Sequence, residues 1–272
     1  MRRTSAMIGK IGPFLRDLGE VGDLLWEKGW AERNAGNISI NLGILATARK
    51  SVRRTQAGRI DPPCPKLGGM AFLVTAAGSR MRDLSRHPRG NAGLIRVEED
   101  GGGYRVLWGG TRERLFTPTS ELQTHLALHE FLIEKRRPER AVLHTHPDEL
   151  IALTHACEIG GEEELNRILL GMLPEVKIFV PEGVAFVPYE VTGSPELARV
   201  TTRGLGSHQV VLWEKHGCLS VGKDVFEAFD AIDTLNKAAR IFLLCKSAGY
   251  APAGLSDAQL DELGRRFGNQ GA

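Results

Sequence analysis

The stretch AVLHTHPDEL, residues 141–150, places two of the protein's eight histidines one residue apart, directly after an apolar run. Successive side chains of an extended strand alternate between its two faces, so His144 and His146 are expected to point the same way. Two imidazoles on one face can grip a single metal ion, because histidine is the commonest metal ligand. They can equally be polar residues at the solvated end of a strand, and this decapeptide leaves both interpretations open.

Outward from this stretch, strand and helix patterns follow one another along the sequence. Apolar runs and period-two alternation predict strands at 38–42, 70–75, 141–146, 176–180 and 183–189, and two strands each within 92–110 and 209–222. Apolar spacing of three to four residues predicts helices at 147–157, 194–206 and 224–249, one after Pro13, and one opened by TPTSE at 117. Because there is no regular βαβ alternation, we expect one α/β domain over residues 1–272, with a central, mostly antiparallel sheet covered by helices.

A basic, proline-containing segment at about 45–69 is predicted to be a long surface loop. It carries the basic residues Arg49, Lys50, Arg53, Arg54 and Arg59, followed by Pro62, Pro63 and Pro65. Aromatic side chains, which would stack on bases, do not interleave with the basic ones. A solvated loop is therefore favoured over nucleic-acid binding.

The composition excludes several classes of protein. Of the 272 residues 42% are hydrophobic and the net charge is +2, which favours a folded core and argues against a polyanionic partner. The four cysteines form no C-x-x-C pair, which argues against a disulfide scaffold and fits a reducing compartment. Lys10, Pro13 and Arg16 interrupt any signal-peptide core, and no apolar run approaches the length of a membrane span. We expect a cytoplasmic protein without a membrane partner.

A third histidine strengthens the metal interpretation of the opening pair. His216 lies in VVLWEKHGC, at a predicted turn between two strands, 70 positions after His146. Three protein ligands with an open fourth position are typical of catalytic zinc sites. His125 and His129, spaced i and i+4, form a rival pair on one helix face. The leucines around that pair favour core or supporting histidines over metal ligands.

The helix opened by TPTSE contains a candidate acid–base group, Glu121. One interpretation is a carboxylate in the first turn that the positive end of the helix dipole stabilises by ~0.3–1 kcal/mol. The other is a general base beside a metal. The same helix start, with Ser120, and the small-residue turns NAGN (34–37) and TAAGS (75–79) can each offer backbone N–H groups to an anion.

Five stretches together carry a resemblance to a known family. They are GWAERNAGNISI, FLVTAAG, TPTSELQTHLALHE, VLHTHPDELIALTH and VLWEKHGCLSVG, spread over residues 29–222. In this order they resemble the class II sugar-phosphate aldolases, and within them the branch that acts on L-rhamnulose 1-phosphate. The resemblance implies reversible, zinc-dependent aldol cleavage of this ketose phosphate to dihydroxyacetone phosphate and L-lactaldehyde, by a homotetramer holding one Zn²⁺ per chain.

Carried over residue by residue, the resemblance implies a complete site. His144, His146 and His216 match the zinc ligands, and Glu121 matches the catalytic acid or base. Glu175 matches a second glutamate that assists proton transfer. The residues that match the phosphate pocket are Asn34, Asn37, Ala77, Gly78 and Ser120.

The sequence departs from the family at one turn. Where the family has Gly-Ser-Gly, this protein has Ala76-Ala77-Gly78, and Ala77 cannot offer a hydroxyl to phosphate. Either Ser79 or Arg80 takes its place, or the substrate differs. The alternatives to the aldolase are another sugar-phosphate aldolase, an epimerase or a dehydratase on the same scaffold, and a non-catalytic binding module like the adducin head domain.

Overall fold

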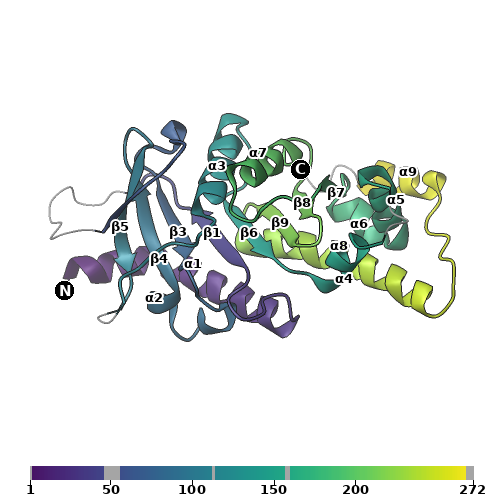
Figure 1. Cartoon of the computed structure of the whole chain (residues 1–272), viewed down its shortest axis with the longest axis horizontal. Coiled ribbons are helices and arrows are strands. Elements are labelled where there is room, and N and C mark those ends of the chain that lie inside the picture. Colours follow the sequence, from purple (N-terminus) through teal and green to yellow (C-terminus); the bar gives the residue numbers. More distant parts are fainter. Residues whose placement is uncertain (1, 46–55, 112–113, 157–159, 268–272) are drawn as a thin grey trace. The chain divides into compact units, whose positions relative to one another are not determined.

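A computed structural model describes residues 2–45, 56–111, 114–156 and 160–267 (Figure 1). The polypeptide falls into two compact units, the first comprising Met1–Leu143 with Gly222–Phe226 and the second His144–Val221 with Glu227–Ala272. The expected single domain over 1–272 stays a prediction. No helix among the described residues is both long and apolar enough to cross a bilayer.

The first unit is built on an antiparallel run of strands. Their order is β2-β5-β4-β3-β1, and Figure 1 shows β3, β4 and β5 side by side. The strands are β1 (Asn37–Asn41), β2 (Ala57–Arg59), β3 (Ala71–Thr75), β4 (Ala92–Val97) and β5 (Gly103–Gly109). The helices are α1 (Arg2–Glu27), α2 (Pro88–Asn91) and α3 (Leu122–Glu134), with 3-10 turns at Pro65–Leu67 and Met81–Asp83.

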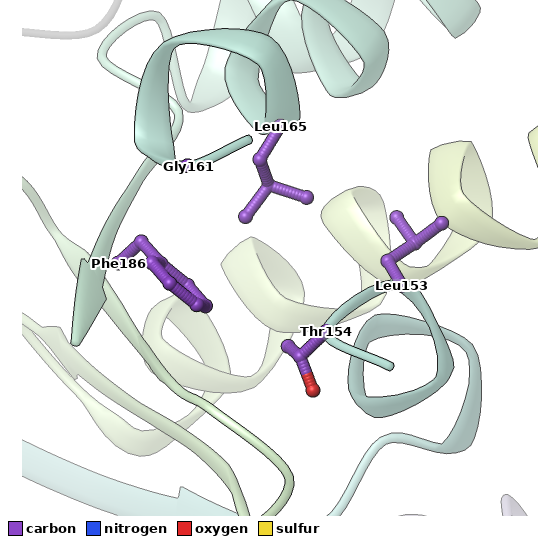
Figure 2. Close-up of a pocket in the computed structure, with 5 residues that line it drawn as sticks. All are labelled: Leu153, Thr154, Gly161, Leu165 and Phe186. Carbon is purple, nitrogen blue, oxygen red and sulfur yellow. The ribbon is translucent and has the colours of Figure 1, made fainter. Parts of the chain in front are cut away.

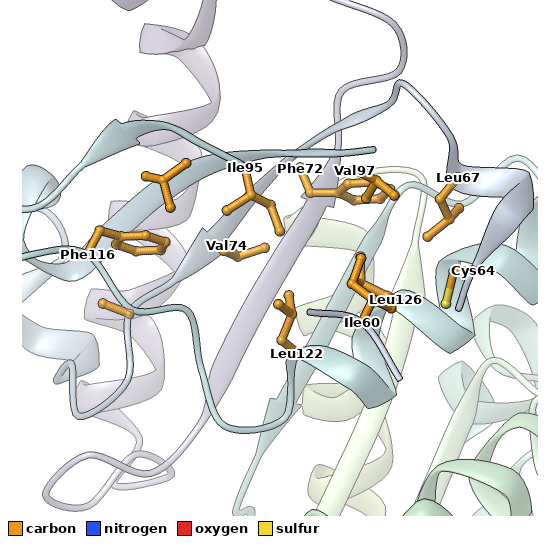
Figure 3. Close-up of a cluster of buried hydrophobic side chains, with 12 residues drawn as sticks. Ile60, Cys64, Leu67, Phe72, Val74, Ile95, Val97, Phe116, Leu122 and Leu126 are labelled. Carbon is orange, nitrogen blue, oxygen red and sulfur yellow. The ribbon is translucent and has the colours of Figure 1, made fainter. Parts of the chain in front are cut away.

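Helix α3 is held against this sheet by one apolar cluster (Figure 3). Leu122 and Leu126 of α3 belong to the same buried cluster as Phe72 and Val74 of β3. Burying a leucine side chain stabilises a fold by about 1.5–3 kcal/mol, so this cluster fixes where α3 begins relative to β3. The candidate residue Glu121 stands directly before that helix.

The predicted surface loop at about 45–69 is wrong in its second half. Residues 57–59 form β2, and Ile60, Cys64 and Leu67 are buried in the cluster that holds α3. The prolines suggested a loop, but the apolar residues among and beside them pack into the core, and Arg59 is exposed on the edge strand β2. Arg49, Lys50, Arg53 and Arg54 lie outside the described residues.

The second unit begins inside β6 (Ala141–Thr145), within which the polypeptide passes from one unit to the other. Strand β7 (Val184–Val187) pairs parallel with β8 (Val210–Trp213), which pairs antiparallel with β9 (Gly217–Gly222). The helices are α4 (Asp148–Leu153), α5 (Glu162–Met172), α6 (Pro174–Phe179), α7 (Pro195–Gly204), α8 (Val225–Ser247) and α9 (Asp257–Phe267). The α/β class and the largely antiparallel strand pairing are confirmed.

Two further predictions of local structure are wrong. Residues 176–180 do not form a strand, because Pro174 opens the short helix α6, which packs against α5 and α9. A five-residue apolar run fits a strand or a buried helical turn equally well, and proline at the first helical position favours the helix. The first helix was expected to start after Pro13, but α1 runs through it from Arg2, at the loss of one backbone hydrogen bond.

Candidate active site

Three histidines of the second unit meet at one point. His144 is buried near the end of β6, His146 follows the strand, and His216 lies in the turn between β8 and β9. One potential ligand atom from each lies within 4.8 Å of the other two. The ring centroids of His144 lie 5.1 Å from those of His146 and 5.0 Å from those of His216. The tertiary structure thus brings together the three residues selected from sequence.

The turn that carries His216 is shaped by its two neighbours. Lys215 has a left-handed backbone with φ of 58°, and its N–H donates to Thr154 Oγ1 at 2.8 Å. A Cβ atom at Gly217 would lie 2.6 Å from the carbonyl oxygen of Thr145 and 2.8 Å from the His146 ring. Only glycine lets the turn approach β6 this closely. Glycine at position 217 is therefore what allows His216 to lie beside His144 and His146.

His144 is held in the form that binds a metal. Its Nδ1 lies 2.9 Å from the carbonyl oxygen of Cys218 and donates to it, which leaves Nε2 without a proton. Burial lowers the pKa of His144 well below its usual value, and His146 and His216 lower it further. The ring also packs on Trp213, with centroids 4.6 Å apart. A neutral, oriented imidazole is the ligating form.

The donor set fits a borderline-soft divalent cation. It consists of one imidazole nitrogen from each of the three histidines. Among the described residues, this is the cluster of histidine, cysteine or acidic side chains in which three ligand atoms come within 4.8 Å of one another. Hard cations such as Mg²⁺ and Ca²⁺ prefer oxygen ligands, whereas zinc accepts three histidines and keeps one position open. The residues therefore fit the zinc that the resemblance implies.

The candidate acid–base residue belongs to the first unit. Glu121 is buried and precedes α3 as its N-cap residue, one position earlier than the expected first turn. Its side chain makes no capping bond; instead Oε2 accepts a hydrogen bond of 3.1 Å from Nδ2 of Asn37. The dipole of α3 still acts on a carboxylate at this position, but the hydrogen bond of the carboxylate is with Asn37. Glu121 points at a neighbouring strand rather than at its own helix.

The rival pair His125 and His129 faces β1. Both rings bond Ser39 Oγ, with His125 Nδ1 at 2.7 Å and His129 Nε2 at 2.8 Å. The rings are fully buried, and the pKa of His129 is lowered to about 3 by burial first and by His125 second. Both nitrogens of His125 and Nε2 of His129 thus have hydrogen-bond partners inside the protein. This agrees with the supporting role that the apolar neighbours favoured.

The segments that were expected to hold phosphate converge in the first unit. The N–H of Ile38 donates to Thr75 Oγ1 at 3.1 Å, and that of Thr119 donates to the Thr75 carbonyl at 2.9 Å. These two bonds join the end of the turn at 34–37 and the start of α3 to the strand that leads into 76–79. Within these segments Asn34 and Ser120 are exposed. Gly78 is also exposed and has φ of 69°.

Sequence reasoning missed a cation at this turn. Nη2 of Arg114 donates to the Ala77 carbonyl at 2.7 Å, which places a guanidinium beside Gly78. Ser79 is only 4% exposed, whereas Arg80 is exposed. Arg114 lies in a polar stretch between β5 and α3 with no periodicity, so only its basic character was visible in the sequence.

The second predicted glutamate stands apart from the histidine cluster. Glu175 is exposed in the first turn of α6, and it is not a member of the group His144, His146 and His216. Its assignment stays a prediction.

A small pocket in the second unit is lined by Leu153, Thr154, Gly161, Leu165 and Phe186 (Figure 2). Its volume of about 20 Å³ is room for one water molecule. The lining carries no titratable side chain, so it supplies no catalytic group. Its Thr154 is the residue that accepts the Lys215 N–H and so supports the turn of His216.

Comparison with known proteins gives a consistent result. Residues 16–243 match the model of the family described as "Class II Aldolase and Adducin N-terminal domain". A rhamnulose-1-phosphate aldolase of Bacteroides thetaiotaomicron is 40% identical over 252 residues, covering 91% of either protein. A second one, from Listeria monocytogenes, is 34% identical, covering 94% of this protein and 93% of the relative. The crystal structure of a sugar-phosphate aldolase from Thermotoga maritima superimposes with a TM-score of 0.76 at 34% identity, over 90% of this protein and 100% of that chain.

Proposed function

The protein belongs to the class II aldolase and adducin family, and on that premise we propose that it cleaves L-rhamnulose 1-phosphate reversibly to dihydroxyacetone phosphate and L-lactaldehyde. The observation that carries the proposal is the cluster of His144, His146 and His216 with potential ligand atoms within 4.8 Å. A non-catalytic binding module has no need of three converging imidazoles. The high similarity to proteins named rhamnulose-1-phosphate aldolase supports the choice of substrate.

We propose that the cluster holds one Zn²⁺ per protein molecule. A divalent metal supplies Lewis-acid stabilisation of the negative charge that develops when the carbon–carbon bond breaks. Residues around the cluster orient the three rings. The Cys218 carbonyl fixes the His144 ring, and Gly217 allows His216 to approach His144 and His146. Because all three rings are neutral ligands, they leave the positive charge of the metal undiminished.

Glu121 is the proposed acid–base group of the reaction. In the cleavage direction the bonding electrons pass to the ketose fragment as an enediolate, and the aldehyde departs. Glu121 then delivers a proton to the enediolate carbon, and in the reverse direction removes it. The hydrogen bond from Asn37 supports this role, because it aims one carboxylate oxygen and leaves the other for substrate. Glu175 is proposed to assist transfer of the hydroxyl proton.

The phosphate group is proposed to bind at the turns of the first unit. Asn34, Ser120 and the Gly78 N–H are the proposed donors to it, while Ala77, whose own N–H donates to the Thr117 carbonyl, fixes the turn. The exposure of Asn34, Gly78 and Ser120 supports this role. Holding a remote phosphate fixes the reacting carbons in place, which contributes to rate as well as affinity.

The test combines metal analysis with an activity assay on the purified protein. We expect about one zinc per protein molecule, cleavage of L-rhamnulose 1-phosphate, loss of cleavage after chelation, and its recovery on adding zinc. Epimerisation or dehydration of a sugar phosphate without cleavage would assign a different reaction on the same scaffold. A protein with no metal and no turnover would favour the adducin-like binding module.

Two further properties are proposed on the resemblance. We propose a homotetramer, which sedimentation equilibrium of the zinc-loaded protein tests. We also propose a cytoplasmic location, in keeping with cysteines 64, 218 and 245 being free. Fractionation of the source cells checks the compartment.

A further inference from the structure

A line of four hydrogen bonds leads from Glu121 into the core of the first unit. Asn37 Nδ2 donates to Glu121, and Asn37 Oδ1 makes a short bond with Nε2 of His125. Ser39 Oγ lies 2.7 Å from His125 Nδ1 and 2.8 Å from His129 Nε2. We call these five residues the His129–Glu121 network.

The network is sealed from water. Ser39 and His125 are 0% exposed, His129 is 1% exposed, and the two residues at the other end are 6–7% exposed. His129 also packs against the Phe72 ring with centroids 5.0 Å apart. Polar groups in such surroundings keep their partners, because water cannot replace a broken bond.

The direction of each bond follows from chemistry. Because the Asn37 amide nitrogen donates to Glu121, its oxygen faces His125 as an acceptor, so Nε2 of His125 carries a proton. A neutral His125 then has a lone pair on Nδ1, to which Ser39 donates. The hydroxyl has one hydrogen, so its remaining contact accepts from Nε2–H of His129. Every donor points toward the carboxylate.

We infer that Asn37, Ser39, His125 and His129 are positioning residues that hold the Glu121 carboxylate as a hydrogen-bond acceptor aimed for proton transfer. This rests on the proposed function for the reaction affected. Asn37, which was expected in the phosphate pocket, is assigned here to Glu121, because both ends of its amide are engaged inside the network. Ser39, His125 and His129 act through Asn37 and touch no substrate.

The depth of the network has a functional consequence. Glu121 opens α3, and His125 and His129 follow it on the same helix, while Asn37 and Ser39 share one strand, β1. The network therefore ties the acid–base group to the packing of a helix on a sheet. A change at His129, eight positions from Glu121 in sequence, is expected to be felt in turnover.

The first test removes the central hydroxyl. Ser39→Ala leaves both ring nitrogens without a partner, and we expect kcat for L-rhamnulose 1-phosphate to fall by roughly 10–100-fold with KM within about twofold. Ser220→Ala is the matched control: it also removes a fully buried strand hydroxyl, from β9, and should leave kcat close to wild type. Equal kcat in Ser39→Ala and wild type would overturn the inference.

The second test changes His129, at the end of the network remote from Glu121. It decides the inference even if Ser39→Ala does not fold. His129→Gln keeps an N–H that can donate to Ser39, whereas His129→Leu keeps bulk and loses the donor. We expect His129→Gln to retain most of the wild-type kcat and His129→Leu to lose roughly tenfold or more. The same kcat in both variants would show that His129 only fills space.

The third measurement reports the network without any turnover. In protein labelled with ¹⁵N-histidine, ring nitrogen shifts distinguish protonated from unprotonated nitrogens, and His125→Gln identifies the His125 signals. We expect the proton on Nε2 of His125 in wild type and both tautomers in Ser39→Ala. A proton on Nδ1 in wild type would refute the bond directions. If wild type does not cleave L-rhamnulose 1-phosphate, the proposed function fails, while these spectra still decide the network.

Discussion

Gly217 lies so close to Thr145 that a Cβ at position 217 would stand 2.6 Å from the Thr145 carbonyl oxygen. The contact joins the turn of His216 to the strand end that carries His144 and His146. The backbone of Thr145 cannot move aside without moving the two histidines that flank it. The spacing of the three histidines therefore depends on the absence of a side chain at position 217.

Gly217→Ala is expected to separate His216 from the other two ligands. Zinc affinity should fall roughly 10–100-fold, the usual effect of disturbing the residues that support a metal ligand. Competition with a chromogenic chelator measures this. Gly12→Ala is the control, because a Cβ there meets nothing within 4 Å. Unchanged zinc affinity in Gly217→Ala would mean that the turn adapts freely.

Removing His144 should abolish both metal binding and cleavage. His144→Ala deletes the buried ligand whose ring orientation the Cys218 carbonyl fixes, so we expect zinc content near zero and no detectable turnover. His208→Ala serves as the control, since this residue is outside the cluster. Full zinc content in His144→Ala, measured by atomic emission, would reopen the case for another metal site.

Glu121→Gln distinguishes proton transfer from a structural role. Glutamine keeps the size of the side chain but cannot take a proton from the substrate carbon or return one to it. We expect turnover to fall by roughly 10²–10⁴-fold with zinc still bound, and unfolding free energy to change by less than about 1 kcal/mol. The decisive assay is exchange of solvent deuterium into dihydroxyacetone phosphate. Wild-type exchange in the zinc-loaded variant would contradict the assignment.

Phosphate recognition should depend on Arg114 more than in relatives that carry a serine at the turn. Arg114 bonds the Ala77 carbonyl and stands beside Gly78. A charge-assisted hydrogen bond contributes about 1.5–3 kcal/mol, so Arg114→Gln should raise KM for the 1-phosphate roughly 10–100-fold. Cleavage of unphosphorylated rhamnulose should change little.

Two companion variants interpret that result. Arg105→Gln removes an exposed arginine that pairs with Glu98 on the sheet, and it should leave KM unchanged. Ala77→Ser restores the hydroxyl of the family pattern and should lower KM in the Arg114→Gln background. If Ala77→Ser changes neither the cleavage rates of rhamnulose and its 1-phosphate nor the ratio of those rates, the missing hydroxyl has no part in binding.

His129 predicts a pH dependence of stability. Its pKa is about 3 in the folded protein, because burial disfavours the charged ring, and near 6.5 in the unfolded one. Between these values the unfolded state binds the extra proton, so stability is fully present above pH 6.5 and is lost as pH falls toward 3. The loss amounts to about 1.4 kcal/mol per pH unit.

Urea unfolding at pH 7 and pH 5 measures the effect. The difference in unfolding free energy between the two pH values should be about 2 kcal/mol smaller in His129→Gln than in wild type, because glutamine does not titrate. Comparing the variant with wild type cancels the contribution of His144. Identical pH differences in the two proteins would show that folding does not lower the pKa of His129.

Local sequence patterns predicted several features of the candidate site. Period-two alternation after an apolar run predicted that His144 and His146 point the same way, and their ring centroids lie 5.1 Å apart although β6 ends at Thr145. The hydroxyl and proline residues of TPTSE located the start of α3 to within a few residues, and with it Glu121. These signals are readable because strand alternation and helix initiation depend on neighbours a few positions apart.

Other features were decided only by tertiary structure. His216 joins residues 70 and 72 positions before it, and Ser39 bonds His125 across 86 positions, distances over which no sequence periodicity extends. The apolar residues beside the prolines of 57–69 were predicted to lie in a loop, but in the structure they are buried in the core of the first unit. Nothing in the sequence distinguished Arg114 from other basic residues, and only the folded structure shows its hydrogen bond to the Ala77 carbonyl. The sequence by itself indicated the candidate side chains for the chemistry and the local element in which most of them lie, whereas their mutual bonds arise only when strands and helices remote in sequence pack together.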